Sequence, residues 1–393
     1  MLINPYTPGA GRLPSYLAGR DKTISEAKDI INNTLAGYPG RPIIYYGLRG
    51  VGKTVLLNQI EDEIEDENII HKYIEVNEQE NFKQNISSAI QSAIHKISFA
   101  ETSKDFLKGV MSSFKAFNAK WSPENGEVSF GFDCDTKSIE ITNSGSFVDD
   151  LKEMLLLLGK LALKSNKCIC FFIDEIQYMK KTDFEALLTA IHRVGQKRFP
   201  IIFFGAGLPK ILKMAGDVKS YSERLFDFVN IDSLLKPDAT DAIIKPAIKL
   251  GVEYEPDAIE FIFQETGGYP YFIQEFGEQV WGKINENKLI TYKSAIETLP
   301  KFLKKLDESF FKVRYDRTTP KEKEFMFAMV KCNNLPCTIS QISEIMVKEV
   351  ESISPCRGKL INKGLIYATG HGALDFTVPQ FDLFLKRINP QIN

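Results

Sequence analysis

Short apolar runs alternate with longer amphipathic stretches between residues 40 and 232 of this 393-residue chain. A near-continuous apolar run suits a strand buried on both faces of a parallel sheet, and an amphipathic stretch suits the helix that crosses to the next strand. The pattern therefore predicts an α/β fold with a doubly wound parallel sheet. The expected strands are Pro42–Tyr46, Ile69–Val76, Cys168–Ile173 and Pro200–Gly205. Helices are expected at about Thr23–Leu35, at Val55–Ile64, after the second strand through about Ile97, and at Asp183–Gly195.

From about Ser233 the strand signals stop and helical spacing continues. Four helices are expected there, at about Pro237–Leu250, Pro256–Thr266, Pro270–Asn285 and Tyr292–Phe311. Three shorter helices follow, and two apolar runs around a glycine-containing turn then predict a hairpin. These last elements are Pro320–Lys331, Ile339–Met346, Ile353–Lys363, Leu365–Ala368 and Leu374–Val378. Three helices followed by a hairpin predict a winged helix.

Three domains follow from this order of elements. Residues 1–232 form the α/β domain with an N-terminal arm, residues 233–312 a helical lid domain, and residues 313–393 the winged-helix domain. Residues from about 102 to 146 interrupt the α/β pattern, and the Asn125-Gly126 turn within them predicts a β-hairpin. A surface decoration is favoured over a partner-binding element for this insertion, because no residue in it indicates chemistry.

One stretch carries the strongest chemical signal: Gly47-Leu48-Arg49-Gly50-Val51-Gly52-Lys53-Thr54 has the spacing G-x-x-x-x-G-K-[ST] between a predicted strand and a predicted helix. Its glycines can turn successive amide groups toward a triphosphate at the positive end of the following helix. Lys53 is expected to reach the β and γ phosphates, and Thr54 to bind Mg²⁺. A chance glycine-rich turn would not need the strand and helix on its two sides. The predicted ATP-binding residues of this phosphate-binding loop (P-loop) are Gly47, Arg49, Gly50, Val51, Gly52, Lys53, Thr54 and Val55.

A second signal is the pair Asp174-Glu175 at the end of the buried run that begins at Cys168. Ligands of open α/β sheets bind beyond the carboxyl ends of the strands. Asp174 is therefore expected to support Mg²⁺ and Glu175 to polarise the attacking water. Alone, such a pair is most often a solvated strand end, and it is the upstream loop that favours the catalytic interpretation.

Composition adds few constraints. The formal net charge is −2, yet residues 301–393 hold fifteen basic and ten acidic side chains, an excess that permits DNA contact without requiring it. The six cysteines show no zinc spacing and are interpreted as reduced thiols of a cytoplasmic protein, with no membrane span or signal peptide expected. The four scattered histidines and the lack of a G-x-S-x-G elbow do not support a hydrolase triad.

The order of five motifs resembles the origin-recognition-like AAA+ and STAND P-loop ATPases. The motifs are Tyr16-Leu17-Ala18-Gly19-Arg20-Asp21, the phosphate loop, the run from Phe171 to Gln177, Ser222-Glu223-Arg224-Leu225-Phe226, and Gly268-Tyr269-Pro270. The resemblance implies that Ala18, Gly19 and Arg20 lie near the adenine. It also implies that Arg224 acts as an arginine finger on a neighbouring subunit of a homo-oligomer. A surface ion pair of Arg224 with Glu223 or Asp227 is the alternative.

The resemblance also assigns the G-x-P turn at Gly268-Tyr269-Pro270 a role in coupling nucleotide state to lid position, whereas simple helix capping by Pro270 is the alternative. Two departures from the family matter. The polar sensor residue expected after the fourth strand is replaced by Phe204-Gly205-Ala206-Gly207, and the helix from Pro270 lacks the arginine that many AAA+ lids place against the γ-phosphate. A slow, switch-like ATPase is therefore expected rather than a motor.

The output of such a switch has two interpretations. The third helix and the hairpin tip of the winged helix offer side chains to a major groove or to phosphates, and the candidates for contact with double-stranded DNA are Arg357, Lys359, Lys363 and His371. The same residues suit the solvated face of a protein-contact module in a signalling or defence switch. A nucleotide-binding protein without turnover is a third interpretation.

Overall fold

The computed structural model describes residues 3–77, 81–97, 104–121, 146–218, 222–332, 334–370 and 372–392. The hairpin predicted around Asn125 and the DNA-contact candidate His371 lie outside the described residues. The chain divides into two compact units, which we describe separately. The sheet unit comprises Arg20–Gly47 and Lys53–Asn230, and the lid unit comprises Met1–Gly19, Leu48–Gly52 and Ile231–Asn393.

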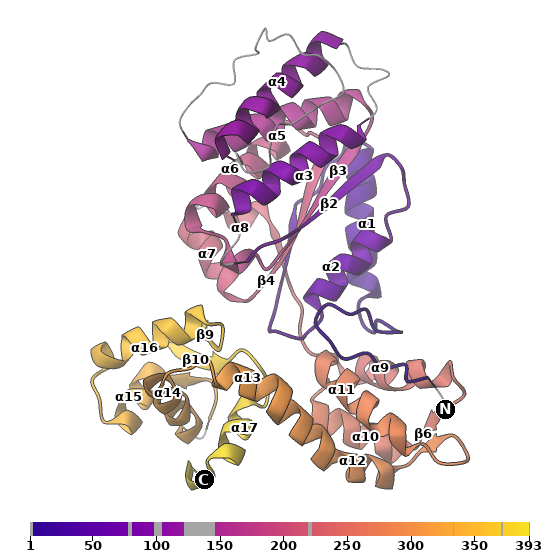
Figure 1. The fold of residues 1–393 in the computed structure, drawn as a ribbon, viewed down its shortest axis with the longest axis vertical. Helices are drawn as coiled ribbons and strands as arrows, with labels where there is room; N and C mark the ends of the chain where they lie inside the picture. Colours follow the sequence, from indigo (N-terminus) through magenta and orange to yellow (C-terminus); the bar gives the residue numbers. More distant parts are fainter. Residues whose placement is uncertain are drawn as a thin grey trace. The chain divides into compact units, whose positions relative to one another are not determined.

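A five-stranded parallel sheet forms the centre of the sheet unit (Figure 1). Its strands are β1 (Ile43–Tyr46), β2 (Ile69–Glu75), β3 (Cys168–Asp174), β4 (Ile201–Gly207) and β5 (Asp227–Asn230). Their order is β2-β3-β4-β1-β5, so β4 lies between the strand before the loop and the strand that ends in Asp174. This arrangement confirms the predicted α/β fold, while β5 is a strand that the sequence pattern did not predict.

Helices cover both faces of this sheet because side chains alternate between the faces along each strand. Phe171 and Phe203 stack 5.0 Å apart in the core on one face, and Phe172 and Phe204 stack 5.3 Å apart on the other. Figure 1 shows α1 and α2 side by side, away from α3, α5 and α6. The helices of this unit are α1 (Asp21–Leu35), α2 (Lys53–Asp62), α3 (Phe82–Lys96), α4 (Lys104–Trp121), α5 (Phe147–Lys164), α6 (Lys181–Gln196), α7 (Lys210–Val218) and α8 (Ser222–Leu225), with the 3₁₀ turn η2 (Ile176–Tyr178).

The lid unit begins with four helices, as predicted. They are α9 (Lys236–Ile248), α10 (Pro256–Thr266), α11 (Pro270–Val280) and α12 (Tyr292–Lys305), with the 3₁₀ turn η3 (Trp281–Lys283) and two short parallel strands, β6 (Glu253–Tyr254) and β7 (Leu289–Ile290). The N-terminal arm packs on these helices: the Tyr6 hydroxyl lies 2.7 Å from the Tyr254 hydroxyl and donates to the Ile243 carbonyl. The arm is therefore held by its contacts with this unit.

A π-helical turn, η4 (Leu306–Phe311), and α13 (Lys312–Tyr315) continue α12 into the last part of the chain. There three helices pack on one another beside a small antiparallel sheet of order β8-β10-β9. These elements are α14 (Pro320–Lys331), α15 (Ile339–Met346), α16 (Val350–Asn362), β8 (Cys337–Thr338), β9 (Ile366–Gly370), β10 (Ala373–Phe376), α17 (Phe381–Ile388) and η5 (Pro390–Ile392). The bounds of α14 and α15 are those predicted, whereas α16 begins three residues earlier than expected. No helix within the described ranges is long and apolar enough to cross a membrane.

Candidate functional site

The loop between β1 and α2 adopts backbone conformations that its glycine residues permit. Gly50 and Gly52 have φ angles of 84° and 93°, in the left-handed region where a side chain would be strained. Lys53 opens α2 and is 9% exposed, and its Nζ donates a 3.0 Å hydrogen bond to the Gly47 carbonyl. The lysine therefore folds back along the loop, where its ammonium group can meet phosphate oxygens.

The two sequence motifs meet at a single hydrogen bond. Thr54, at the start of α2, donates from Oγ1 to Asp174 Oδ2 at the end of β3, over 2.6 Å. Tyr73 on β2 donates to the same oxygen at 3.0 Å, and the Glu175 amide donates to Asp174 Oδ1 at 2.7 Å. Burial, and then the negative charge of Asp174, raise the pKa of Tyr73 above its ordinary value, so Tyr73 remains a donor to the carboxylate.

This oxygen pair fits a magnesium ion. Hydroxyl and carboxylate oxygens are the protein ligands that Mg²⁺ accepts, usually one or two of them together with phosphate oxygens and waters. Asp174 is 3% exposed, and its hydrogen bonds fix the direction of both carboxylate oxygens. No group of three or more His, Cys, Asp or Glu side chains suited to a metal occurs in the described part of the chain. The donor set thus matches a metal that is bound jointly with phosphate.

Glu175 occupies an unusual backbone position next to Asp174. Its φ is 54°, a left-handed conformation that costs a residue with a side chain about 1–2 kcal/mol. Such strain clusters at functional sites, where the surrounding structure maintains it. The Gln177 amide donates from Nε2 to the Glu175 carboxylate, which fixes the direction of that side chain.

Two glycines of β4 make room for the turn that follows Glu175. A Cβ at Gly205 would collide with Ile176, and a Cβ at Gly207 would lie 2.9 Å from Gln177 Oε1. That same oxygen accepts a 2.9 Å hydrogen bond from the Leu208 amide. Gln177 therefore places a polar amide group at the end of β4, where the strand itself has no polar side chain. Sequence reasoning missed both Tyr73 and Gln177 as parts of this site.

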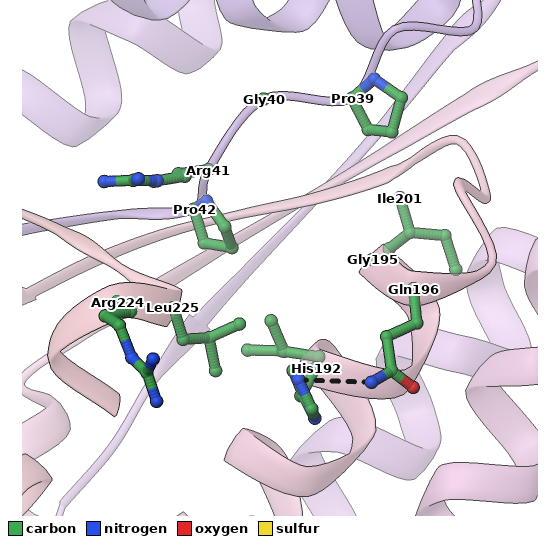
Figure 2. Close-up of a pocket in the computed structure, with 11 residues that line it drawn as sticks. Pro39, Gly40, Arg41, Pro42, His192, Gly195, Gln196, Ile201, Arg224 and Leu225 are labelled. Carbon is green, nitrogen blue, oxygen red and sulfur yellow. Dashed lines mark hydrogen bonds between the residues drawn. The ribbon is translucent and has the colours of Figure 1, made fainter. Parts of the chain in front are cut away.

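Arg224 lies elsewhere in the sheet unit, at the rim of a pocket of about 620 Å³ (Figure 2). The pocket lies near the amino-terminal ends of β1 and β4, and Arg41 and His192 also line it. Arg41 pairs with Asp227 at 3.2 Å, and no ion pair joins Arg224 to Glu223 or Asp227 among the described residues. The guanidinium of Arg224 is exposed on this surface.

The predicted adenine-box residues fall on both sides of a unit boundary. Gly19, with a φ of 65°, lies against α9, since a Cβ there would be 2.8 Å from the Asp238 carboxylate. Arg20 is the N-cap of α1 in the sheet unit. Their predicted proximity to adenine stays a prediction.

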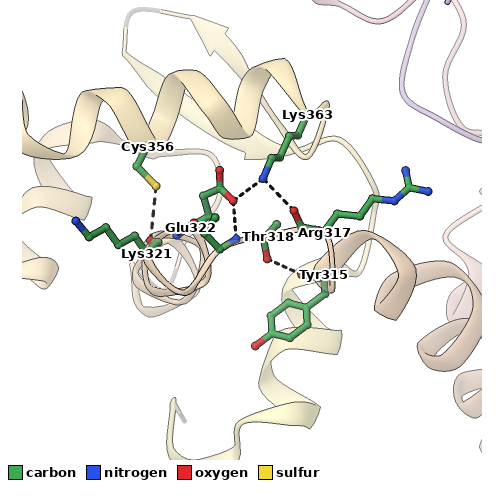
Figure 3. Close-up of polar contacts among 8 residues, drawn as sticks. Tyr315, Arg317, Thr318, Lys321, Glu322, Cys356 and Lys363 are labelled. Carbon is green, nitrogen blue, oxygen red and sulfur yellow. Dashed lines mark hydrogen bonds and ion pairs between the residues drawn. The ribbon is translucent and has the colours of Figure 1, made fainter. Parts of the chain in front are cut away.

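The three DNA-contact candidates that the structure describes, Arg357, Lys359 and Lys363, have different environments. Lys363 donates to Glu322 Oε2 at 2.7 Å and to the Arg317 carbonyl at 2.9 Å, so the fold itself occupies its ammonium group (Figure 3). Arg357 is half-buried and Lys359 is exposed. Burial opposes ionisation of Glu322, but hydrogen bonds from Lys363 and from the Thr319 backbone outweigh it and lower the pKa of this carboxyl. The candidates thus do not act as one group of free cations.

Comparison with protein families supports the site. Residues 16–204, which contain the loop and the Asp174-Glu175 pair, match the AAA ATPase domain family. This matched segment is similar to AAA ATPase domains. Residues 308–385 match a domain of unknown function, DUF8462. A search of curated proteins gives no match.

Solved structures show a fold similar to that of this chain. The Walker-type ATPase PABY2304 of Pyrococcus abyssi is 12% identical, with a TM-score of 0.54, over 94% of this chain and 96% of that one. The ORC2 protein of Aeropyrum pernix, in ADPNP and ADP complexes, is 13% identical, with a TM-score of 0.53, over 98% of this chain and 96% of that one. The chain therefore has the fold of an origin-recognition-like AAA+ P-loop ATPase, as the motif order predicted.

Proposed function

We propose that this AAA+ protein is a slow, ATP- and Mg²⁺-dependent switch. The observation that carries the proposal is the 2.6 Å hydrogen bond from Thr54 to Asp174, because it joins the phosphate loop to the acidic strand end at the point where a bound metal would lie. The nucleotides in the Aeropyrum pernix ORC2 complexes, ADPNP and ADP, are consistent with this ligand class.

In the proposed mechanism, Lys53 and the loop amides orient the phosphates, and Thr54 and Asp174 hold Mg²⁺. When bound, Mg²⁺ supplies positive charge that offsets the charge of the transferring phosphoryl group. Glu175 accepts a proton from the water that attacks the γ phosphorus, while Gln177 keeps the carboxylate pointed at that water. The end of β4 contributes no charged or hydroxyl side chain to this transition state, which is the reason to expect slow turnover.

Binding and turnover are tested separately. We expect the unaltered protein to bind ATP and ADP with Mg²⁺ by calorimetry, and Lys53→Ala to remove this binding. Lys22→Ala is the matched control, since the Lys22 side chain is 90% exposed on α1. Binding that survives in Lys53→Ala would overturn the assignment of the loop.

Arg224 is proposed to act on the nucleotide of a neighbouring copy, because its exposed guanidinium lies at a pocket rim without a carboxylate partner in the described sheet unit. A mixing experiment tests this. Arg224→Gln keeps an intact nucleotide site and Lys53→Ala keeps an intact arginine, so each is inactive alone and their mixture should regain hydrolysis. No recovery at any concentration would argue against action in trans.

The output of the switch is proposed to be contact with double-stranded DNA through α16, which packs against α14 and α15 and whose Lys359 is exposed. The internal ion pair of Lys363 favours the second candidate, a protein-contact module in a signalling or defence switch. Fluorescence anisotropy with a generic duplex at two salt concentrations, with ATP-Mg²⁺, ADP-Mg²⁺ or no nucleotide, separates them. DNA contact predicts salt-sensitive binding that Lys359→Gln weakens and Lys331→Gln, an exposed control on α14, does not. No binding in any state would favour the protein-contact module.

A further inference from the structure

The pocket beside Arg224 lies far from the hydrogen bond that joins Thr54 to Asp174 within the sheet unit (Figure 2). Ile201 of β4 lines this pocket and pairs in register with Ile169 of β3. Asp174 lies five residues beyond Ile169 on the same strand, which is a separation of about 16 Å along the sheet. A ligand in the pocket would therefore leave the proposed metal position free.

One part of the pocket lining is apolar. Ile191 of α6 and Ile201 of β4 both line it, and each is only 4% exposed. Leu225, Pro39 and Pro42 add further apolar surface. The apolar part of a ligand that contacts these side chains would be removed from water, which is the main favourable contribution to binding.

The other part of the lining consists of side chains that can donate hydrogen bonds. These polar residues are Arg41, His192, Gln196 and Arg224, and Figure 2 shows the two arginines on one side of the pocket, away from Gln196. No carboxylate belongs to the described lining, since neither Glu223 nor Asp227 lines the pocket although both lie close to Arg224 in sequence. The polar lining therefore suits an anionic group.

The two arginines differ in how much charge they offer to a ligand. Arg41 pairs with Asp227 at 3.2 Å, which offsets its charge, whereas Arg224 makes no ion pair with Glu223 or Asp227. One guanidinium charge thus remains for a ligand. A guanidinium presents a planar fork of donors that matches a carboxylate, and a single charge suits a monovalent carboxylate better than a divalent phosphate.

We propose that this pocket binds a small organic carboxylate with an apolar body. The carboxylate contacts Arg224, and the apolar body packs on Ile191, Ile201 and Leu225. The pocket volume of about 620 Å³ lies within the range of sites for small molecules, about 300–1,000 Å³. This binding requires neither nucleotide nor a second subunit, so it is independent of the proposed action of Arg224 on a neighbouring copy.

The test is a titration of the nucleotide-free full-length chain with hexanoate and with 1-hexanol, followed by saturation-transfer NMR. The two probes share an apolar chain, but only hexanoate carries a charge. We expect hexanoate to bind saturably and at least about tenfold more tightly than hexanol, because the alcohol cannot accept charged hydrogen bonds as a carboxylate does.

Two variants of exposed residues change the charge at the pocket in opposite directions. Arg224→Gln should weaken hexanoate at least about fivefold, because it removes the uncompensated guanidinium. Asp227→Asn should strengthen hexanoate about two- to threefold, because it removes the carboxylate that offsets Arg41, and such a gain cannot come from loss of the fold. Lys213→Gln is the matched control, since Lys213 is exposed on α7 and does not line the pocket.

Three results would overturn the proposal. Equal affinities for hexanoate and hexanol would mean that the arginines do not recognise the carboxylate. Unchanged hexanoate affinity in Arg224→Gln would place the binding outside this pocket, and the absence of saturable hexanoate binding would exclude the site. Failure of the protein to bind ATP would overturn only the proposed nucleotide switch, because this titration contains no nucleotide.

Discussion

Gln177 offers the sharpest test of the candidate site, because one side chain makes two separable contacts. It is 4% exposed, its Nε2 donates to the Glu175 carboxylate, and its Oε1 accepts from the Leu208 amide at 2.9 Å. Truncation in Gln177→Ala leaves the buried Leu208 N–H without an acceptor, which costs about 1–3 kcal/mol of unfolding free energy. For a unit of this size that loss lowers the melting temperature by about 3–10 °C.

The same truncation removes the hydrogen bond that Gln177 donates to the Glu175 carboxylate. General-base catalysis contributes about 10²–10⁴-fold to a rate, so a base that loses one of its orienting hydrogen bonds should lower kcat on the order of tenfold. KM for ATP should change little, because Lys53, Thr54 and Asp174 keep their contacts. Single-turnover hydrolysis and thermal melting of the same preparations measure the two effects independently.

Two further variants complete the test. Gln177→Glu keeps an oxygen for the Leu208 amide, so its melting temperature should fall less, while a second carboxylate beside Glu175 should move the pH–rate profile to higher pH. Lys180→Ala, an exposed change at the next turn, should affect neither quantity. If Gln177→Ala melts lower but hydrolyses ATP within twofold of the unaltered protein, Gln177 is structural and our account of Glu175 positioning is wrong.

Three other predictions address neighbouring parts of the molecule. Glu175→Gln should bind ATP normally and lower its hydrolysis at least about 100-fold, and normal turnover would exclude Glu175 as the base. Tyr73→Phe removes a donor to Asp174 and should raise the Mg²⁺ concentration for half-maximal ATPase activity by about tenfold, so a titration curve that overlays the original would contradict the role of Tyr73. The lowered pKa of Glu322 means that its contribution to stability is present above its unfolded pKa of about 4.3 and is lost as pH falls through the lower folded value. Chemical unfolding at pH 7 and pH 3 should therefore show a smaller acid-dependent loss in Lys363→Gln than in the unaltered protein, and equal losses would refute this.

The sequence predicted the parts of the fold that have a strong local signal. Strands β1, β3 and β4 are buried and consist of near-continuous apolar residues, so their pattern is plain. Strand β5 was missed because Asp227–Asn230 is short, lies at the sheet edge and has polar residues at both ends. The later start predicted for α16 has a local reason as well, since Pro355 lies inside the helix and a proline is more often found in the first turn.

The sequence did not predict those contacts of the site that depend on which strands are neighbours in the sheet. Thr54 follows from the spacing of the loop motif, and Asp174 and Glu175 follow from their place after a buried apolar run together with that loop. The role of Gln177 depends on β4 lying next to β3 and on Gly207 leaving space for an amide, and neither fact is visible in one local stretch.

These contacts indicate how the proposed slow ATPase would act as a switch. A motor needs rapid turnover, whereas a switch needs a large difference between the ATP-bound and ADP-bound states. Rings continue without interruption from Tyr271 through Phe310 and Phe311 to Phe384, so a shift of Tyr271 at the loop requires repacking near α17. Close-packed aromatic rings resist gradual deformation and favour discrete arrangements. Phe310→Leu provides a direct test of this coupling. Coupling through the rings requires this change to reduce the difference between ATP and ADP in hydrogen exchange at α17 while leaving both affinities within a few-fold.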